Sequence, residues 1–227
     1  MTHEILPHGL PKRIAPDLWQ VRGSLPRPLS RNMTVVRMHD GGLFLHSVIA
    51  MNEEGMTALE DLGRPAAIVV PHPLHIMDAG FYAERYPAVP IVAGPESRAK
   101  LRERGVRVDA GLDEVLPGLG VHPHVVPALR YEEVVFDVPV QGGRALLFTD
   151  LIAEGAAKGL LGKLMGAPGG SGVPRFVKLR QIRSRRAVRD FLAQLAATPD
   201  IQAVTAAHSR PVTADCAKWL SRASARC

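Results

Sequence analysis

The chain has 227 residues, of which 46% are hydrophobic and 22% are charged. A chain of this length and composition can bury a full-sized core, which excludes disorder as its main state. Its two cysteines are too few for a disulfide framework. The first residues lack the apolar stretch of a signal peptide, and no apolar run approaches the length that crosses a bilayer. We therefore expect a cytoplasmic protein without a membrane partner, organised as one domain over residues 1–227.

The net charge of +6 comes from one segment of the chain. Residues 175–189 carry seven basic side chains and no acidic one, and without those seven positive charges the rest of the chain has a net charge of −1. A local basic segment can bind phosphate or nucleic acid, but it is also typical of the solvated start of a helix. Only 5% of the residues are aromatic, which is unfavourable for stacking against single-stranded bases. We therefore favour a solvated helix start over a nucleic-acid partner.

Short strands and helices alternate in the first half of the chain. Two apolar runs, 33–38 and 43–46, flank Asp40-Gly41-Gly42. An Asp-Gly pair in this position predicts a hairpin because its turn needs positive φ. Asn52 predicts the N-cap of a helix, and the continuous apolar run 66–70 predicts a strand buried on both faces.

The second half of the chain continues this alternation. Gly142-Gly143 predicts a second hairpin turn, Ser184 the N-cap of an amphipathic helix, and Pro211 the first residue of a final helix. The Gly-rich stretch 159–174 is either a mobile lid or a tolerated insertion. Further strands are expected at 18–21, 89–92, 106–108, 121–126, 134–138, 145–148 and 201–206, and a further helix at 95–104. This order predicts two packed sheets with helices outside them.

Polar side chains follow three of the predicted strands, at the point where each strand ends. His72, His75 and Asp78 lie in the loop after the strand 66–70, Asp150 follows the strand 145–148, and His208 follows the strand 201–206. Each of them alone is as consistent with a helix cap or a surface group. In open α/β sheets, however, binding sites collect at the C-terminal ends of strands. Imidazole and carboxylate together are a ligand set for zinc, iron or manganese.

This layout resembles the metallo-β-lactamase superfamily, and within it a divergent branch. The resemblance rests on segments spread over most of the chain, namely Leu18-Trp19, 33–37, 41–47, 68–75, Tyr86-Pro87, 133–136, 148–151 and 208–212. It implies an α/β fold, a four-layer αββα sandwich of metallo-β-lactamase type, with the site along one edge.

The sequence departs from the superfamily pattern at the site. Typical members carry H-x-H-x-D-H after the buried strand, whereas here two His residues stand three apart and Ala79 takes the place of the last His. Leu129 stands where another His ligand is expected. Asp150 matches the usual bridging Asp, and His208 matches the last His of the pattern. The resemblance then implies at most one divalent metal, zinc before iron or manganese, held by some of His72, His75, Asp78, Asp150 and His208.

A pair of histidines offers an alternative ligand source. His122 and His124 would point to the same face of a strand. Pro123 between them indicates a strand edge, so we expect both at the surface.

Two functional hypotheses follow. The first is a metal-dependent hydrolase that cleaves an ester, thioester, amide or phosphoester of a small-molecule substrate, with Asp78 or Asp150 orienting the attacking water or acting as base. The alternative is a non-catalytic binding protein on the same scaffold that has lost its metal centre. Ala79 and Leu129 favour this alternative, because each replaces an expected ligand.

Overall fold

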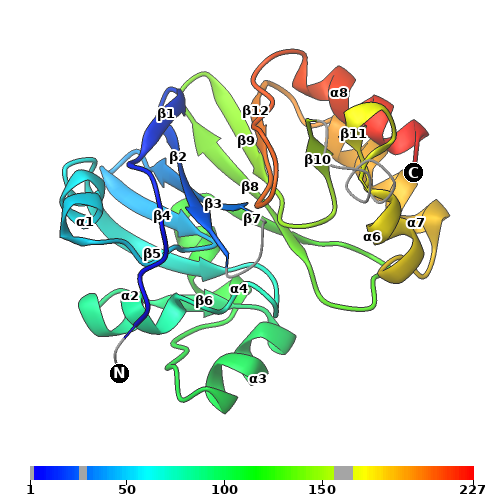
Figure 1. Ribbon diagram of the computed structural model, residues 1–227. Helices are drawn as coiled ribbons and strands as arrows, with labels where there is room; N and C mark the ends of the chain where they lie inside the picture. Colours follow the sequence, from blue (N-terminus) through cyan, green and yellow to red (C-terminus); the bar gives the residue numbers. More distant parts are fainter. Residues whose placement is uncertain (1–2, 26–29, 156–165) are drawn as a thin grey trace.

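Two β-sheets pack face to face and carry helices on their outer sides (Figure 1). The computed structural model describes residues 3–25, 30–155 and 166–227. The first sheet has the strand order β1-β2-β3-β4-β5-β6. Its strands are β1 (Lys12–Ala15), β2 (Leu18–Ser24), β3 (Ser30–Arg37), β4 (Gly42–His46), β5 (Arg64–Val70) and β6 (Ile91–Ala93). β1 to β4 are antiparallel neighbours, whereas β4, β5 and β6 run parallel.

The second sheet has the order β12-β9-β8-β7, in which only β12 and β9 pair in parallel. Its strands are β7 (His122–Val125), β8 (Val134–Val140), β9 (Gly143–Leu147) and β12 (Ile201–Thr205). A separate antiparallel pair is formed by β10 (Ala153–Glu154) and β11 (Ser171–Gly172). The two predicted hairpins therefore belong to different sheets, β3–β4 to the first and β8–β9 to the second.

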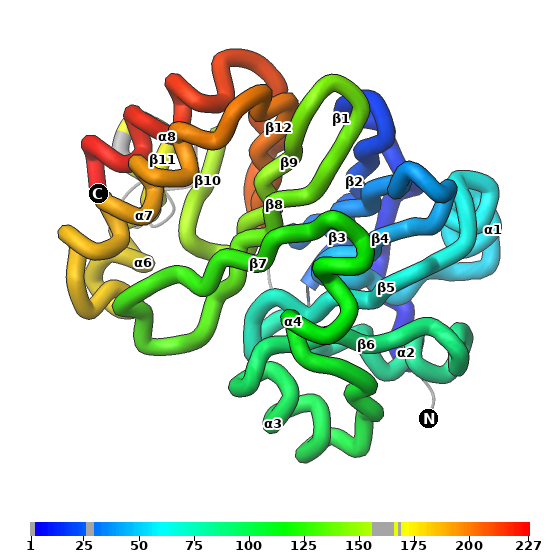
Figure 2. Tube along the Cα trace, turned by 180° about the vertical axis from the view of Figure 1, so that it is seen from behind, coloured from blue at the N-terminus to red at the C-terminus, as the bar shows by residue number. Residues whose placement is uncertain are grey.

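The longer helices lie on the outer faces of the two sheets, as the view from behind also shows (Figure 2). On the side of the first sheet lie α1 (Glu53–Glu60), α2 (Ala79–Arg85) and α3 (Pro95–Glu103). α4 (Leu112–Val115) and η1 (Leu116–Leu119) link β6 to β7, and their residues Leu112 and Leu116 belong to the core between the two sheets. On the side of the second sheet lie η2 (Pro168–Gly170), α6 (Arg175–Arg180), α7 (Arg185–Ala196) and α8 (Cys216–Ala225). None of the helices within the described ranges is both long and apolar enough to cross a membrane.

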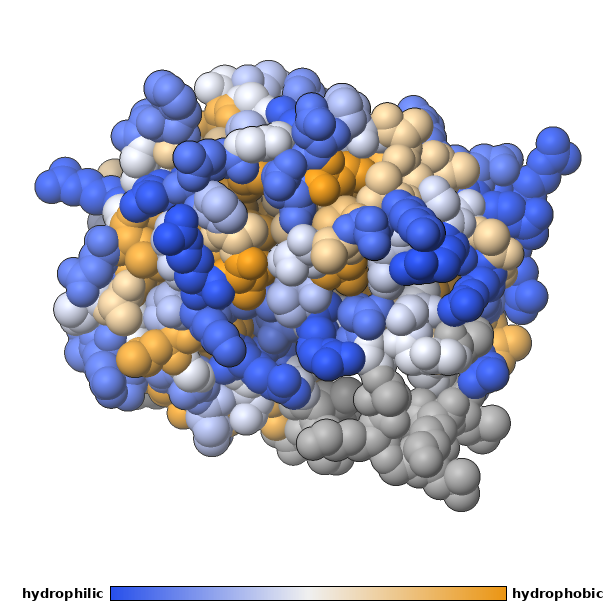
Figure 3. All heavy atoms as spheres, turned by 90° about the horizontal axis from the view of Figure 1, so that it is seen from above, coloured by the Kyte–Doolittle hydropathy of each residue, from blue (hydrophilic) through white to orange (hydrophobic). Residues whose placement is uncertain are grey.

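Alternate residues of the central strands face two different cores, which explains the layers. On β8, Val134, Phe136 and Val138 face the first sheet, whereas Val135 packs outward with α7 and α8. The face-to-face core also holds Phe44 and Leu147. This arrangement confirms the predicted αββα sandwich. In the space-filling view, hydrophilic side chains cover most of the visible face and apolar side chains show as patches between them (Figure 3).

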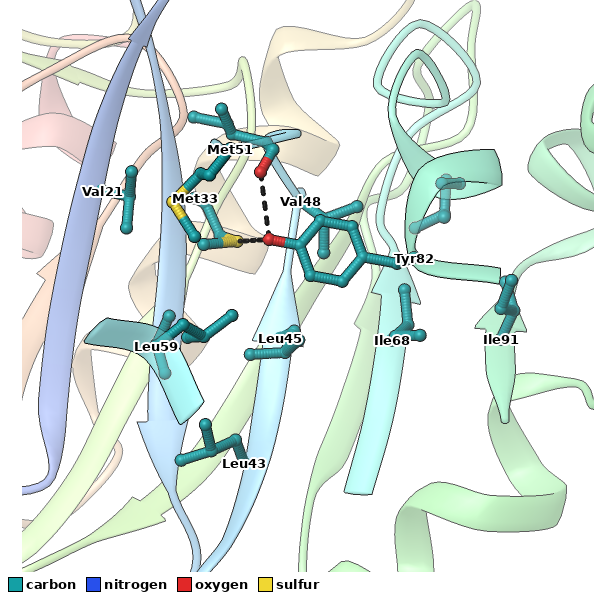
Figure 4. Packing of buried hydrophobic residues seen from close by; sticks show 14 of the residues in the cluster. Val21, Met33, Leu43, Leu45, Val48, Met51, Leu59, Ile68, Tyr82 and Ile91 are labelled. Carbon is teal, nitrogen blue, oxygen red and sulfur yellow. Dashed lines mark hydrogen bonds between the residues drawn. The ribbon is translucent and has the colours of Figure 1, made fainter. Parts of the chain in front are cut away.

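A buried tyrosine fixes α2 on the first sheet. Tyr82 of α2 is fully buried, and its hydroxyl donates to the carbonyl oxygen of Ile49 at 3.0 Å and lies 3.5 Å from the sulfur of Met33 (Figure 4). Its ring packs among Leu45, Ile68 and other members of the same core. α2 is thereby fixed above the sheet, directly after the loop that contains His72 and His75.

Tyr82→Phe is expected to lower the free energy of unfolding by roughly 1–2 kcal/mol, because the buried carbonyl of Ile49 loses its hydroxyl donor while the ring remains. Tyr86→Phe is the matched control. The Tyr86 hydroxyl donates to Glu60 at the surface, and its loss should cost less than about 0.5 kcal/mol. Urea unfolding midpoints at an unchanged m-value measure both effects. Equal losses in the two variants would contradict the assigned role of Tyr82.

Two predicted elements are wrong. The run 106–108 is not a strand, because side chains satisfy the backbone groups that a strand would pair with. Arg107 donates to the carbonyls of Tyr86 and Val89, and the Asp109 carboxylate accepts from the Ile91 N–H. The final helix does not begin at Pro211, because Val212 instead forms an isolated antiparallel bridge with Val204 and the helix starts at Cys216.

The Gly-rich stretch 159–174 is described only in part. Residues 159–165, with the apolar start of the predicted lid, lie outside the described residues. Residues 166–174 include η2 and β11. The basic segment 175–189 forms α6 and the first turns of α7, whose N-cap Ser184 accepts from the Ala187 N–H as predicted.

Candidate metal centre

The loops after β5, β9 and β12 bring four of the predicted side chains together at one edge of the sandwich. The Oδ1 atom of Asp150 lies 3.3 Å from Nε2 of His75 and 3.3 Å from Nε2 of His208. His72 joins the group from the same loop as His75. One possible ligand atom from each of His72, His75 and Asp150 lies within 4.8 Å of the others.

A serine in a strained backbone conformation orients His75. Ser47 follows β4 with φ of 57°, in the left-handed region, and its side chain is buried. Its hydroxyl oxygen lies 2.9 Å from Nδ1 of His75. This contact leaves Nε2 of His75 directed at Asp150, as expected for a ligand that is held by a neighbouring polar group.

The backbone of β3 fixes His208 in the same way. Nδ1 of His208 lies 2.8 Å from the carbonyl oxygen of Ser30, which can only accept, so Nδ1 carries the proton. Asn32 secures the loop by donating from its amide to the carbonyls of Ala206 at 3.1 Å and Ser209 at 2.7 Å. The lone pair of neutral His208 therefore lies on Nε2 and faces the carboxylate of Asp150.

This orientation requires a positive charge between the two groups. A lone pair that faces a carboxylate oxygen is repulsive unless a proton or a metal cation lies between them. Burial alone would lower the pKa of His208, but the hydrogen bond and the charge of Asp150 outweigh it and raise the pKa. Burial alone would raise the pKa of Asp150, but His75 and His208 lower it by more, to well below its usual range. The group is built around an ionised carboxylate.

A second carboxylate, which the sequence analysis missed, positions Asp150. Glu133 is fully buried, and its Oε1 atom accepts hydrogen bonds from the backbone N–H groups of Thr149, Asp150 and Leu151 at 3.0, 3.1 and 3.1 Å. Burial, together with the negative charge of Asp150, raises the pKa of Glu133 to about 8. The resemblance includes residue 133, but a Glu that precedes a strand has no sequence feature that marks it as buried.

Asp78 lies outside this group. Its Oδ2 atom accepts from the Arg31 guanidinium and, at 2.8 Å, from the Ala50 N–H. The Arg31 and Asp78 side chains are only 8% and 10% exposed. Asp78 thus ties the loop after β5 to β3 and to the segment after β4.

The positions of the expected but missing ligands are occupied by packed apolar residues. Ala79, the first residue of α2, is fully buried in the core of the first sheet. Leu129 packs against the core of the second sheet and bridges to Ile182. Tyr131, from the same loop as Leu129, places its ring 6.4 Å from that of His72. The structure does not bring His122 and His124, both on β7, into the group of potential ligands among the described residues.

The donor set fits a divalent cation. Two ligand atoms at about 2.0–2.1 Å from a tetrahedral zinc lie about 3.3–3.4 Å apart. Asp150 Oδ1 keeps this spacing, 3.3 Å, to Nε2 of both His75 and His208. Imidazole and carboxylate are ligands that zinc, iron and manganese accept.

Solved structures of similar shape are metallo-β-lactamases. The chain matches a metallo-β-lactamase from Hirschia baltica with a TM-score of 0.62 at 14% identity, covering 97% of this chain and 98% of that one. It matches FIM-1 from Pseudomonas aeruginosa, in its mono-zinc form, with a TM-score of 0.62 at 11% identity over 97% and 96% of the two chains. A metallo-β-lactamase from Pontibacter korlensis gives 0.64 at 15% identity over 96% and 99%. No protein-family model and no curated protein matches the sequence. The chain therefore has the metallo-β-lactamase fold.

Proposed function

We propose that this chain is a metal-dependent hydrolase that cleaves an ester, thioester, amide or phosphoester bond of a small molecule. The observation that carries the proposal is the Asp150 carboxylate, which faces Nε2 of both His75 and His208 at 3.3 Å. Metal-dependent hydrolysis is in keeping with the fold, and the mono-zinc form of FIM-1 shows that a chain of this fold can hold one zinc ion. The candidate ligands are found among His72, His75, Asp150 and His208, with Asp78 and Arg31 holding the loop in place.

A metal in this position would lower the pKa of a water molecule and polarise the bond to be cleaved. The protein residues orient these groups. Ser47 and the Ser30 carbonyl hold the imidazoles of His75 and His208, and Glu133 holds the backbone of Asp150. Because the pKa of Asp150 lies well below its usual range, the carboxylate is a weak base. It would orient the attacking water by accepting a hydrogen bond.

The second candidate is a non-catalytic binding protein on the same scaffold. It is favoured by Ala79 and Leu129, since both pack as core residues where the superfamily pattern has metal ligands.

Elemental analysis of the purified protein, after supply of zinc, iron or manganese, distinguishes the metal-dependent hydrolase from the non-catalytic binding protein. We expect about one metal per chain for the wild type and for His122→Ala, an exposed histidine on β7, and a large loss for His208→Ala. Absence of metal under every supply, together with wild-type behaviour of His208→Ala in hydrolase screens, would select the binding protein.

Metal affinity should depend on pH through His208. Because Asp150 raises the pKa of His208, the metal must displace a proton from it at pH values below that pKa. The apparent affinity should therefore fall about tenfold for each pH unit below this pKa and level off above it. His72 adds no slope near neutrality, since burial lowers its pKa to about 4. Zinc competition titrations over a pH series measure the slope, and an affinity independent of pH would contradict it.

A further inference from the structure

His72 differs from the other two histidines in which ring nitrogen is free. Its Nδ1 atom accepts the backbone N–H of Leu74 at 3.0 Å. An Nδ1 atom that accepts a hydrogen bond carries a lone pair and no proton, so the neutral ring has its proton on Nε2. The same contact excludes the doubly protonated ring, because the N–H at Nδ1 of His72 would then point at the backbone N–H of Leu74.

The proton on Nε2 of His72 has no acceptor within the described residues. Nε2 is buried, and no hydrogen-bond partner lies within reach of it there. His72 forms a group with His75 and Asp150, and because its Nδ1 accepts from the loop backbone, Nε2 is the ring nitrogen left without a partner. An N–H donor without a partner, buried beside a carboxylate and an imidazole, is costly unless a ligand accepts from it.

The opposite arrangement holds at His208. Its Nδ1 donates to the carbonyl of Ser30, which leaves the lone pair on Nε2 beside Asp150. At His75 the Ser47 hydroxyl can donate or accept, so Nε2 is free to carry a lone pair. A metal ion binds to lone pairs. Nε2 of His75 and Nε2 of His208 can therefore act as metal ligands, whereas Nε2 of His72 can only donate a hydrogen bond.

We propose that His72 is a hydrogen-bond donor to the reacting oxygen and that His75, Asp150 and His208 are the metal ligands. The proposal rests on the hydrolase function above and deepens it. It assigns a two-His, one-carboxylate ligand set, which zinc and iron both accept with positions left open for water and substrate.

The chemistry needs a donor of this kind. In hydrolysis the water oxygen bonds to the carbonyl carbon or phosphorus, and the electron pair of the double bond moves onto the oxygen, which becomes negative. That electron pair then re-forms the double bond as the bond to the leaving group breaks, and the leaving group keeps the electrons of the broken bond and takes a proton that comes from the attacking water. His72 keeps its own proton throughout and stabilises the negative oxygen from Nε2, as the N–H groups of an oxyanion hole do.

The tautomer can be measured directly. Long-range ¹H–¹⁵N correlation spectra of the imidazoles distinguish an Nε2–H ring from an Nδ1–H ring, and zinc is suitable because it is diamagnetic. In the zinc-loaded protein we expect the Nε2–H form for His72 and the Nδ1–H form for His208. Zinc uptake with the Nδ1–H form at His72 would overturn the inference while leaving the hydrolase intact. Absence of zinc uptake would instead reject the proposed function.

Variants provide the second test. His72→Ala should keep about one zinc per chain, whereas His75→Ala should lose it. Activity of His72→Ala should fall about 100- to 1,000-fold, the loss seen when one oxyanion donor is removed. His72→Gln, which retains an N–H donor, should lose less. Loss of zinc from folded His72→Ala to the same degree as from His75→Ala would make His72 a ligand and overturn the inference. If His72→Ala does not fold, the zinc content of His72→Gln and the spectrum of the unmutated protein decide whether His72 is a donor or a ligand.

Discussion

Asp150→Asn is expected to abolish tight metal binding and, with it, hydrolysis. The substitution keeps the size of the side chain but removes the negative charge that faces His75 and His208 at 3.3 Å. The loop itself should hold, because Glu133 accepts from the backbone N–H of Asp150 and not from its side chain. Removing a residue that only hydrogen-bonds to a metal ligand typically weakens metal binding about 10- to 100-fold. Removing the charge of Asp150, which is itself a proposed ligand, should weaken metal binding by more than this.

Elemental analysis and zinc competition titration measure the effect, and circular dichroism checks that the fold is retained. The matched control is Asp190→Asn, an exposed aspartate on α7 whose side chain is 68% exposed. It should bind zinc as the wild type does. If Asp150→Asn retained wild-type zinc content and activity, the site would have to lie elsewhere in the chain.

The sequence was sufficient to predict that polar residues after three of the strands form a site. Each of the runs 66–70, 145–148 and 201–206 is apolar enough to be recognised as a strand, and a residue of ligand type stands two positions after each run. Parallel pairing of β9 with β12 brings Asp150 and His208 to the same end of the second sheet, and the packing of the two sheets brings His75, after β5, to that end. The hairpins were recognisable for a similarly local reason, since Gly41 and Gly142 adopt the positive φ that their turns require.

The residues that support the site were not predictable, because their partners are distant in sequence. Ser47 meets His75 across 28 positions, and Arg31 meets Asp78 across 47. Nothing local distinguishes Ser47 from an ordinary residue after a strand. Asp78 shared its loop with two histidines, and its partner on β3 becomes visible only once the register of the first sheet is known. The tautomer of His72 is likewise set by a backbone N–H that no sequence pattern reveals.

Asp78→Asn should destabilise the fold strongly without removing the metal. Arg31 and Asp78 are both about nine-tenths buried, so the variant leaves the charge of Arg31 buried and uncompensated. Breaking a buried pair from one side typically costs about 3–5 kcal/mol, far more than its formation contributes. Asp17→Asn is the matched control, because it breaks the Asp17–Arg37 pair, whose side chains are 25% and 42% exposed, and should cost less than about 1 kcal/mol.

Two measurements on the same variants separate a structural Asp78 from a ligand. Urea unfolding should shift the midpoint of Asp78→Asn well below that of Asp17→Asn at similar m-values. Zinc content of the folded fraction should stay near one per chain in both, because Asp78 is held by Arg31 and the Ala50 N–H and is not part of the group that His72 and His75 form with Asp150. Replacing both partners, as in Arg31→Met with Asp78→Leu, should recover much of the lost stability, since no buried charge then remains. Loss of zinc from Asp78→Asn with little change in the midpoint would instead make Asp78 a ligand.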